Sequence, residues 1–192
     1  MDRRAAIARL ATITGAIALG SEFFIAGCRR TDKHVAEPFT PADVALLDEI
    51  GDTIIPATDS PGAKAAGIGA FMTMMVTDCY DDDAHVAFQN GLRKIDDEAR
   101  SRHGKSFAAC TPADRLAMLN ELDREQREKR PKPGETPHYF RMMKELTLLG
   151  YFSSEPGCTH ALRYVETPGS YDGNVPYHPG DRVWFDPTRR VG

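Results

Sequence analysis

Residues 40–56 read TPADVALLDEIGDTIIP, and this stretch contains a complete helix together with its start and stop signals. Thr40 offers a hydroxyl for the N-cap, proline suits the first helical position, and Asp43 supplies the carboxylate of a capping box. Pro56 cannot continue a helix because it lacks a backbone N–H. The apolar residues between these signals recur at helical spacing and are Val44, Leu47, Ile50, Ile54 and Ile55. The stretch therefore predicts an amphipathic helix that ends before Pro56.

The same four residues, TPAD, recur at 111–114, where they predict a second helix that runs to Pro131. Its apolar face is expected to hold Leu116, Leu119 and Leu122. Three further helices are predicted from apolar spacing: about 70–79 with Phe71, Met74 and Met75 inward, from Asp81–Asp83 to about His103 with Val86, Phe88, Leu92 and Ile95 inward, and 138–149 with Phe140, Met143, Leu146 and Leu148 inward. We therefore expect an all-α fold, with a single compact domain of about five helices over residues 39–162.

Residues 163–192 break this pattern, since prolines and glycines alternate there with aromatic residues and no regular period survives. Aromatic rings are unfavourable to leave exposed in water, so this extended arm should pack on its own helices, on a partner, or on both. The aromatic residues of the arm are Tyr164, Tyr171, Tyr177, Trp184 and Phe185.

The first 27 residues have the layout of a secretory signal: a basic start, an apolar stretch, then small residues. Twelve residues separate Arg9 from Glu22, against about 20 needed to span a bilayer. The pair Arg3-Arg4 resembles a twin-arginine export signal, and IAGC at 25–28 resembles a lipobox in which Cys28 is diacylated. We expect a periplasmic, membrane-anchored lipoprotein exported by the twin-arginine route, with residues 28–38 as a tether.

The composition is that of an ordinary globular protein: 192 residues, 41% hydrophobic and 27% charged, with a net charge of −4. These values exclude a disordered or fibrous chain. The acidic balance also argues against a nucleic-acid partner, because nucleic-acid binders carry a basic face.

A search for catalytic, cofactor-binding and metal motifs finds none. No Gly-x-Gly-x-x-Gly follows a predicted strand, and no Walker A, Cys-x-x-Cys-His or His-Glu-x-x-His pattern occurs. Asp81–Asp83 lacks the spacing of a calcium loop, and His138 and His160 are interpreted as structural. We therefore expect no catalytic, cofactor or metal site in this chain.

After Cys28, three cysteines remain, and they allow three disulfide pairings in an oxidising compartment. Cys79 with Cys158 is the favoured pair, because both border loops next to the helix predicted over 138–149. The pairings with Cys110 stay open.

Several landmarks occur in order along the chain: DTIIPATDSPGA at 52–63, PH-x-F at 137–140, KELTLLGYFSSE at 144–155 and PG-x-Y-x-G at 168–173. Together they resemble the gluconate 2-dehydrogenase subunit 3 family over about residues 38–178. Where relatives often carry a cysteine after the last of these motifs, this chain carries Asn174.

The resemblance implies a non-catalytic small subunit of a membrane-associated sugar or glucoside dehydrogenase. Its implied partner is a large flavoprotein of the glucose-methanol-choline type that holds FAD, and some complexes add a c-type cytochrome with haem c. The small subunit is expected to supply export, maturation and stability. The block 144–155 should form core and the start of the interface, with Tyr151 and Phe152, and the arm should supply the binding hot spots.

Two other functions compete with this one. The chain could be an independent periplasmic lipoprotein that binds a small ligand or an envelope partner. A self-sufficient enzyme is the third alternative, and the missing cofactor motif disfavours it.

Overall fold

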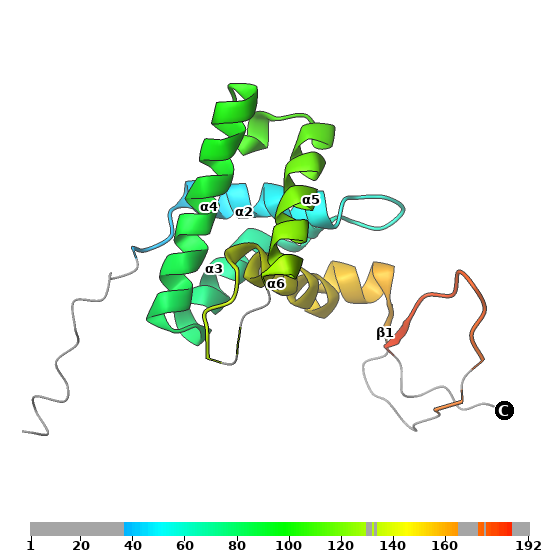
Figure 1. Ribbon diagram of the computed structural model, residues 1–192. Coiled ribbons are helices and arrows are strands. Elements are labelled where there is room, and N and C mark those ends of the chain that lie inside the picture. The colour runs from blue at the N-terminus through cyan, green and yellow to red at the C-terminus, as the bar shows by residue number, and fades with distance from the viewer. Residues whose placement is uncertain (1–36, 130–131, 133, 165–172, 175, 186–192) are drawn as a thin grey trace, which may run out of the picture. The chain divides into compact units, whose positions relative to one another are not determined.

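The computed structural model describes residues 37–129, 132, 134–164, 173–174 and 176–185, and these residues confirm the all-α fold (Figure 1). They contain five α-helices: α2 (Pro41–Ile54), α3 (Ile68–Cys79), α4 (Asp82–His103), α5 (Pro112–Glu128) and α6 (Tyr139–Ser153). Three short helical turns connect or follow them: η1 (Ala63–Ala66), η2 (Phe107–Ala109) and η3 (Gly157–Ala161). None of the helices in this described part is long and apolar enough to cross a membrane.

Helix α2 is the central element, since it packs against α3, α4, α5 and α6. Figure 1 shows it passing behind α4 and α5. Its N-terminus has the expected capping box: the Thr40 hydroxyl accepts from the Asp43 N–H at 3.2 Å, and the Asp43 carboxylate accepts from the Thr40 N–H at 2.7 Å. Leu47 and Ile50 are fully buried, so the stretch 40–56 forms the core helix that its sequence predicts.

Helix α5 begins with the second TPAD, where the Thr111 hydroxyl accepts from the Asp114 N–H at 3.2 Å. Three residues that we expected to face inward are exposed instead, and the prediction is wrong for Met74, Leu116 and Leu148. The reason is that each helix buries a neighbouring stripe. The buried residues are Ile68, Met72 and Val76 on α3, Met118, Leu119 and Leu122 on α5, and Phe140, Met142, Met143, Leu146 and Tyr151 on α6.

Two glycines let α6 approach its neighbours closely. A Cβ atom on Gly91 of α4 would lie 2.1 Å from Cγ of Tyr139, and one on Gly150 of α6 would lie 2.5 Å from Cδ1 of Phe71. Both distances are far below van der Waals contact, so a side chain at either position would force the helices apart.

The described part of the C-terminal arm closes on itself. Strand β1 (Arg163–Tyr164) pairs in parallel with β2 (Trp184–Phe185), and the Arg163 N–H donates to the Val183 carbonyl at 3.0 Å. The Arg163 guanidinium also lies 3.3 Å from the Asp181 carboxylate. The arm therefore has a short closure that its irregular sequence did not predict, and β1 contacts η3 at the end of the helical body.

The first described residues, which precede α2, contact α4. The Phe39 ring stacks on His85 with ring centroids 5.2 Å apart, and Arg93 pairs with the Glu37 carboxylate at 2.6 Å. The end of the expected tether is thus held against the N-terminal half of α4.

Candidate functional site

The two longest family-like motifs meet in space. The Tyr151 hydroxyl, in the block 144–155, donates to the Pro61 carbonyl, in the block 52–63, at 2.6 Å. Tyr151 is 1% exposed. The hydrogen bond therefore ties the end of α6 to the loop that follows α2.

That loop is held tightly at its base and exposed at its tip. A Cβ atom on Gly62 would lie 2.4 Å from the Asp52 carboxylate, and the Ala63 N–H donates to the Ile55 carbonyl at 2.9 Å. At the tip, the Thr58 hydroxyl donates to Asp59 at 2.9 Å and is the main cause that lowers the pKa of Asp59. The positive charge of Arg182 also lowers that pKa, which relates the arm to the tip of the loop.

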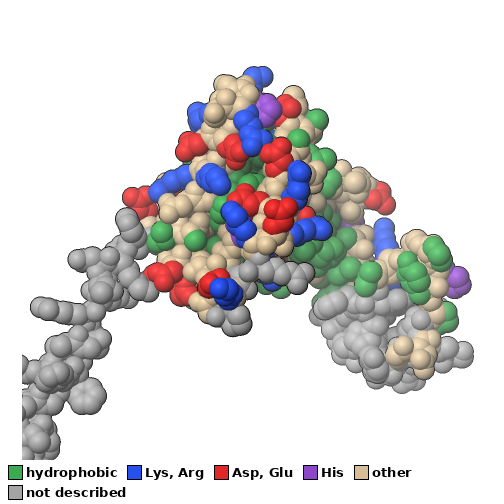
Figure 2. Space-filling view, viewed as in Figure 1, with side chains coloured by type: hydrophobic (Ala, Val, Ile, Leu, Met, Phe, Trp, Pro, Cys, Tyr) green, Lys and Arg blue, Asp and Glu red, His purple; other side chains and the backbone are tan. Residues whose placement is uncertain are grey.

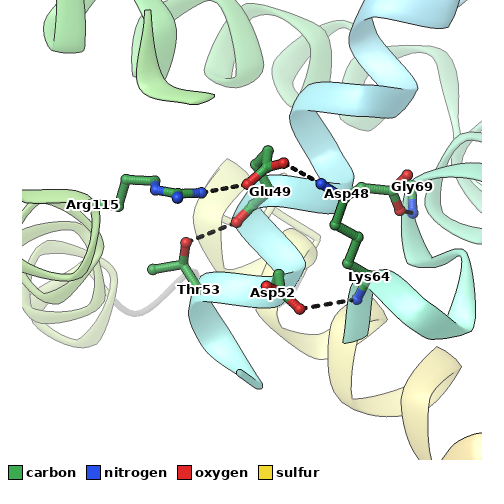
Figure 3. Close-up of polar contacts among 7 residues, drawn as sticks. All are labelled: Asp48, Glu49, Asp52, Thr53, Lys64, Gly69 and Arg115. Atoms are coloured by element: carbon green, nitrogen blue, oxygen red, sulfur yellow. Dashed lines mark hydrogen bonds and ion pairs between the residues drawn. The ribbon is translucent and has the colours of Figure 1, made fainter. Parts of the chain in front are cut away.

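A cluster of charged side chains joins α2 to α5 and η1 (Figure 3). The Glu49 carboxylate pairs with the Lys64 ammonium at 2.5 Å and with the Arg115 guanidinium. The hydrogen bond from Lys64 is the main cause that lowers the pKa of Glu49, and Arg115 lowers it further against the opposing effect of burial. A general base works best with a pKa near the operating pH, so this carboxylate is suited to clamping helices rather than to proton transfer.

The neighbouring Asp48 serves the next helix. Its carboxylate accepts from the Gly69 N–H at 2.7 Å, in the first turn of α3 (Figure 3). A negative charge there complements the helix dipole. The acidic residues of α2 therefore position α3, η1 and α5.

Histidine and acidic residues form no metal site in the described part of the chain, where no group of three or more His, Cys, Asp or Glu side chains could hold an ion. His138 is the N-cap of α6: its Nδ1 accepts from the Phe140 N–H at 3.3 Å. Burial is the main cause that lowers its pKa. This capping role agrees with the structural interpretation of His138.

The expected Cys79–Cys158 disulfide is absent, because all three described cysteines carry free thiols. Cys79 is exposed at the C-terminus of α3, while the Cys158 thiol in η3 lies 3.1 Å from the Phe152 carbonyl and donates to it. Cys110 is buried. Cys79 and Cys158 were paired because both border loops next to the helix 138–149. In the structure, Cys79 lies exposed at the end of α3, and the Cys158 thiol is bonded within η3 and the end of α6.

Large apolar side chains are exposed at the end of α6 and on the arm. Figure 2 shows hydrophobic side chains gathered where Figure 1 draws the end of α6 and η3. We name this set the α6–arm surface: Leu148, Leu149, Phe152, Tyr164, Tyr177 and Val183, with exposed fractions between 40% and 72%. Leu148, Leu149 and Phe152 are neighbours on the last turns of α6, and a contiguous exposed apolar patch is typical of a surface that binds another macromolecule.

The predicted interface residues divide between surface and core. Phe152, Tyr164 and Tyr177 are exposed as expected. Tyr151, also predicted at the interface, has a buried side chain whose hydroxyl is bonded to Pro61, so it offers almost no exposed surface in this chain. The side chains of Tyr171, Trp184 and Phe185 lie outside the described residues, as do Arg3, Arg4 and Cys28.

Sequence reasoning missed Leu149 and Val183 and placed Leu148 in the core. For Leu148 and Leu149 the sequence did contain a signal. One buried stripe of α6 is formed by residues spaced three or four apart: Met143, Leu146, Thr147, Gly150 and Tyr151. Leu148, Leu149 and Phe152 fall outside that stripe. They are therefore exposed on the surface of α6.

Comparison with known families gives one match, and comparisons with curated proteins and with solved structures give none. The profile of the family Gluconate 2-dehydrogenase subunit 3 matches residues 41–169, which is well over half of the 192 residues. This range includes both motif blocks and the hydrogen bond between them. The chain therefore belongs to the gluconate 2-dehydrogenase subunit 3 family, whose members are subunits of a dehydrogenase complex.

Proposed function

We propose that this chain is the non-catalytic small subunit of a membrane-associated, FAD-dependent sugar or glucoside dehydrogenase. Its partner is a large flavoprotein of the glucose-methanol-choline type, which holds the FAD and oxidises the substrate. Some complexes of this kind include a c-type cytochrome with haem c as a further subunit. The small subunit provides export, maturation and stability for the flavoprotein.

The observation that carries this proposal is the α6–arm surface. Leu149 is 53% exposed and Phe152 is 40% exposed, and both lie on α6 beside its buried stripe. Exposing such side chains costs free energy that association with a partner recovers, at roughly 25 cal/mol per Å² of apolar surface buried. The aromatic rings of Phe152 and Tyr164 supply area of the kind that dominates binding energies.

The ion pairs between helices support a structural role. Glu49 is engaged by Lys64 and Arg115, and its pKa lies below the ordinary value. The Lys144 ammonium pairs with the Asp123 carboxylate at 2.6 Å and joins α6 to α5. These groups position helices, so we assign the catalytic chemistry to the partner.

We further propose that the signal with Arg3 and Arg4 exports both subunits together and that a lipid on Cys28 anchors them at the periplasmic face of the membrane. A twin-arginine route carries folded cargo, so a flavoprotein already loaded with FAD can travel with this chain. The contacts of Glu37 and Phe39 with α4 support a tether that is fixed to the body at its inner end.

The test is a pair of matched substitutions on the full chain, co-expressed with the flavoprotein subunit. Leu149→Glu places a charge on the α6–arm surface, and Leu116→Glu places the same charge on α5, where the leucine is exposed to a similar degree. Leu149→Glu should reduce the co-purified flavoprotein by about tenfold, which corresponds to about 1.4 kcal/mol. Leu116→Glu should leave it unchanged. Equal recovery with both variants would refute the proposed docking surface.

A further inference from the structure

A second surface feature lies away from the α6–arm surface. A groove of about 560 Å³ runs between α2 and α4, beside η2. Figure 1 shows α4 crossing α2 in this region. Six of its residues define what we name the α2–α4 groove: Ala42, Asp43, Leu46, Leu92, Asp97 and Ala108.

The charges along this groove are predominantly negative, and two of the carboxylates form no ion pair with a basic side chain of the described residues. Asp43, on α2, accepts hydrogen bonds from the N–H and hydroxyl of Thr40, which are neutral donors. Asp97, on α4, makes no hydrogen bond or ion pair with any described residue. The basic residue of the lining, Arg93, is already paired with Glu37. Each wall therefore presents one carboxylate that forms no ion pair with a basic side chain among the described residues.

The remaining acidic residues of the lining have cationic partners. Glu49 is engaged by Lys64 and Arg115, and Asp96 pairs with Arg100 at 2.8 Å. The chain thus neutralises these two carboxylates and leaves Asp43 and Asp97 for a ligand of positive charge.

The shape of the groove indicates what kind of ligand fits. Its accessible apolar part is made of the exposed alanines Ala42, Ala45 and Ala108 and the half-buried Leu46, whereas Leu92 lies in the floor of the groove and is only 1% exposed. A pocket for a small molecule buries most of its ligand and is enclosed by large side chains. Exposed alanines on α2 and η2 instead let another backbone approach closely, as when a helix lies in a groove.

We propose that the α2–α4 groove binds a segment of a partner protein that has an apolar face flanked by two basic side chains, one opposite Asp43 and one opposite Asp97. The apolar face covers Leu46 and the exposed alanines of the groove. This site is separate from the α6–arm surface, and it does not depend on the function proposed above.

The experiment uses the full chain and two synthetic amphipathic peptides. Both have a face of alanine and leucine, flanked by lysines in the first peptide and by glutamates in the second. Binding is measured by fluorescence anisotropy. The lysine peptide should bind saturably and more weakly at high salt, since salt screens surface charges, while the glutamate peptide should not bind.

A matched pair of variants locates the site. Asp97→Lys should weaken binding of the lysine peptide about tenfold. Glu128→Lys makes the same change of charge at an exposed residue of α5 and should leave binding unchanged. Because Asp97 bonds to none of the residues that the structure describes, circular dichroism should show the same fold in both variants.

Three results would overturn the proposal: no saturable binding, equal binding of the glutamate peptide, or an equal loss of affinity in both variants, which would report net charge only. A dimer that forms without peptide and dissociates in Asp97→Lys would also overturn it, because a second copy of the chain would then occupy the groove. Size-exclusion chromatography of the wild type, Asp97→Lys and Glu128→Lys shows whether each is a monomer or a dimer and so identifies this last case.

Discussion

Removal of the Tyr151 hydroxyl tests whether the two motif blocks stabilise each other. In Tyr151→Phe the ring stays buried, and only the hydrogen bond to the Pro61 carbonyl is lost. A typical intramolecular hydrogen bond contributes 0.5–1.5 kcal/mol net, and a fully buried carbonyl left unpaired costs up to about 3 kcal/mol. Pro61 is only partly buried, so water can replace the lost donor. We expect a loss of about 1 kcal/mol in the free energy of unfolding.

The assay is unfolding by guanidinium chloride, followed by circular dichroism. A loss of about 1 kcal/mol should lower the midpoint by about 0.2–0.3 M at unchanged slope, and should lower the melting temperature by about 2–4 °C. The matched control is Tyr177→Phe, because Tyr177 is 72% exposed. The reasoning is refuted if both variants unfold like the wild type, or if the two lose the same stability.

Three further predictions follow from the packing and the charges. Glu49→Gln should lower the free energy of unfolding by about 2 kcal/mol, because the largely buried Arg115 loses its partner. The pKa of Glu49 is lowered on folding, so this contribution is present above about pH 4.5 and is lost as the pH falls below that value. The acid unfolding curves of variant and wild type should therefore converge. Gly91→Ala should cost about 1–3 kcal/mol in thermal unfolding, because its Cβ would overlap the Tyr139 ring. Truncation after Arg163 should abolish co-purification of the flavoprotein while the helical circular dichroism signal persists.

Each of these has a control or a contrary outcome. Asn90→Ala, at an exposed position of α4 next to Gly91, should leave stability unchanged or raise it slightly. A Glu49→Gln variant that stays less stable than the wild type by the same amount at every pH would show that the ion pairs are not the cause. A truncated chain that still binds its partner would remove the arm from the interface.

The starts of the helices could be predicted from the sequence because they depend on residues only three positions apart. The Thr40 cap and the Thr111 cap each need a hydroxyl and an N–H three residues away, and both signals are local. The face that each helix buries depends on where its neighbours lie. Met74 and Leu148 were therefore misplaced, although their helices were correctly predicted.

The candidate surfaces depend on contacts between distant residues. Tyr151 and Phe152 are adjacent aromatics in one motif, yet the first is in the core and the second on the surface. Tyr151 packs in the core, where its hydroxyl reaches the Pro61 carbonyl ninety residues away, and the local sequence does not reveal such a contact. The α2–α4 groove likewise joins Asp43 with Asp97, and no sequence pattern links the two.

The central claim is that this chain is an accessory subunit whose partner holds the flavin. The most direct measurement is expression of the flavoprotein subunit with and without this chain, followed by its FAD content, its amount in the periplasm and its dye-linked sugar oxidation. The account predicts that all three fall when this chain is omitted, and that this chain purified alone oxidises no sugar. Unchanged FAD content, export and activity in its absence would contradict the account.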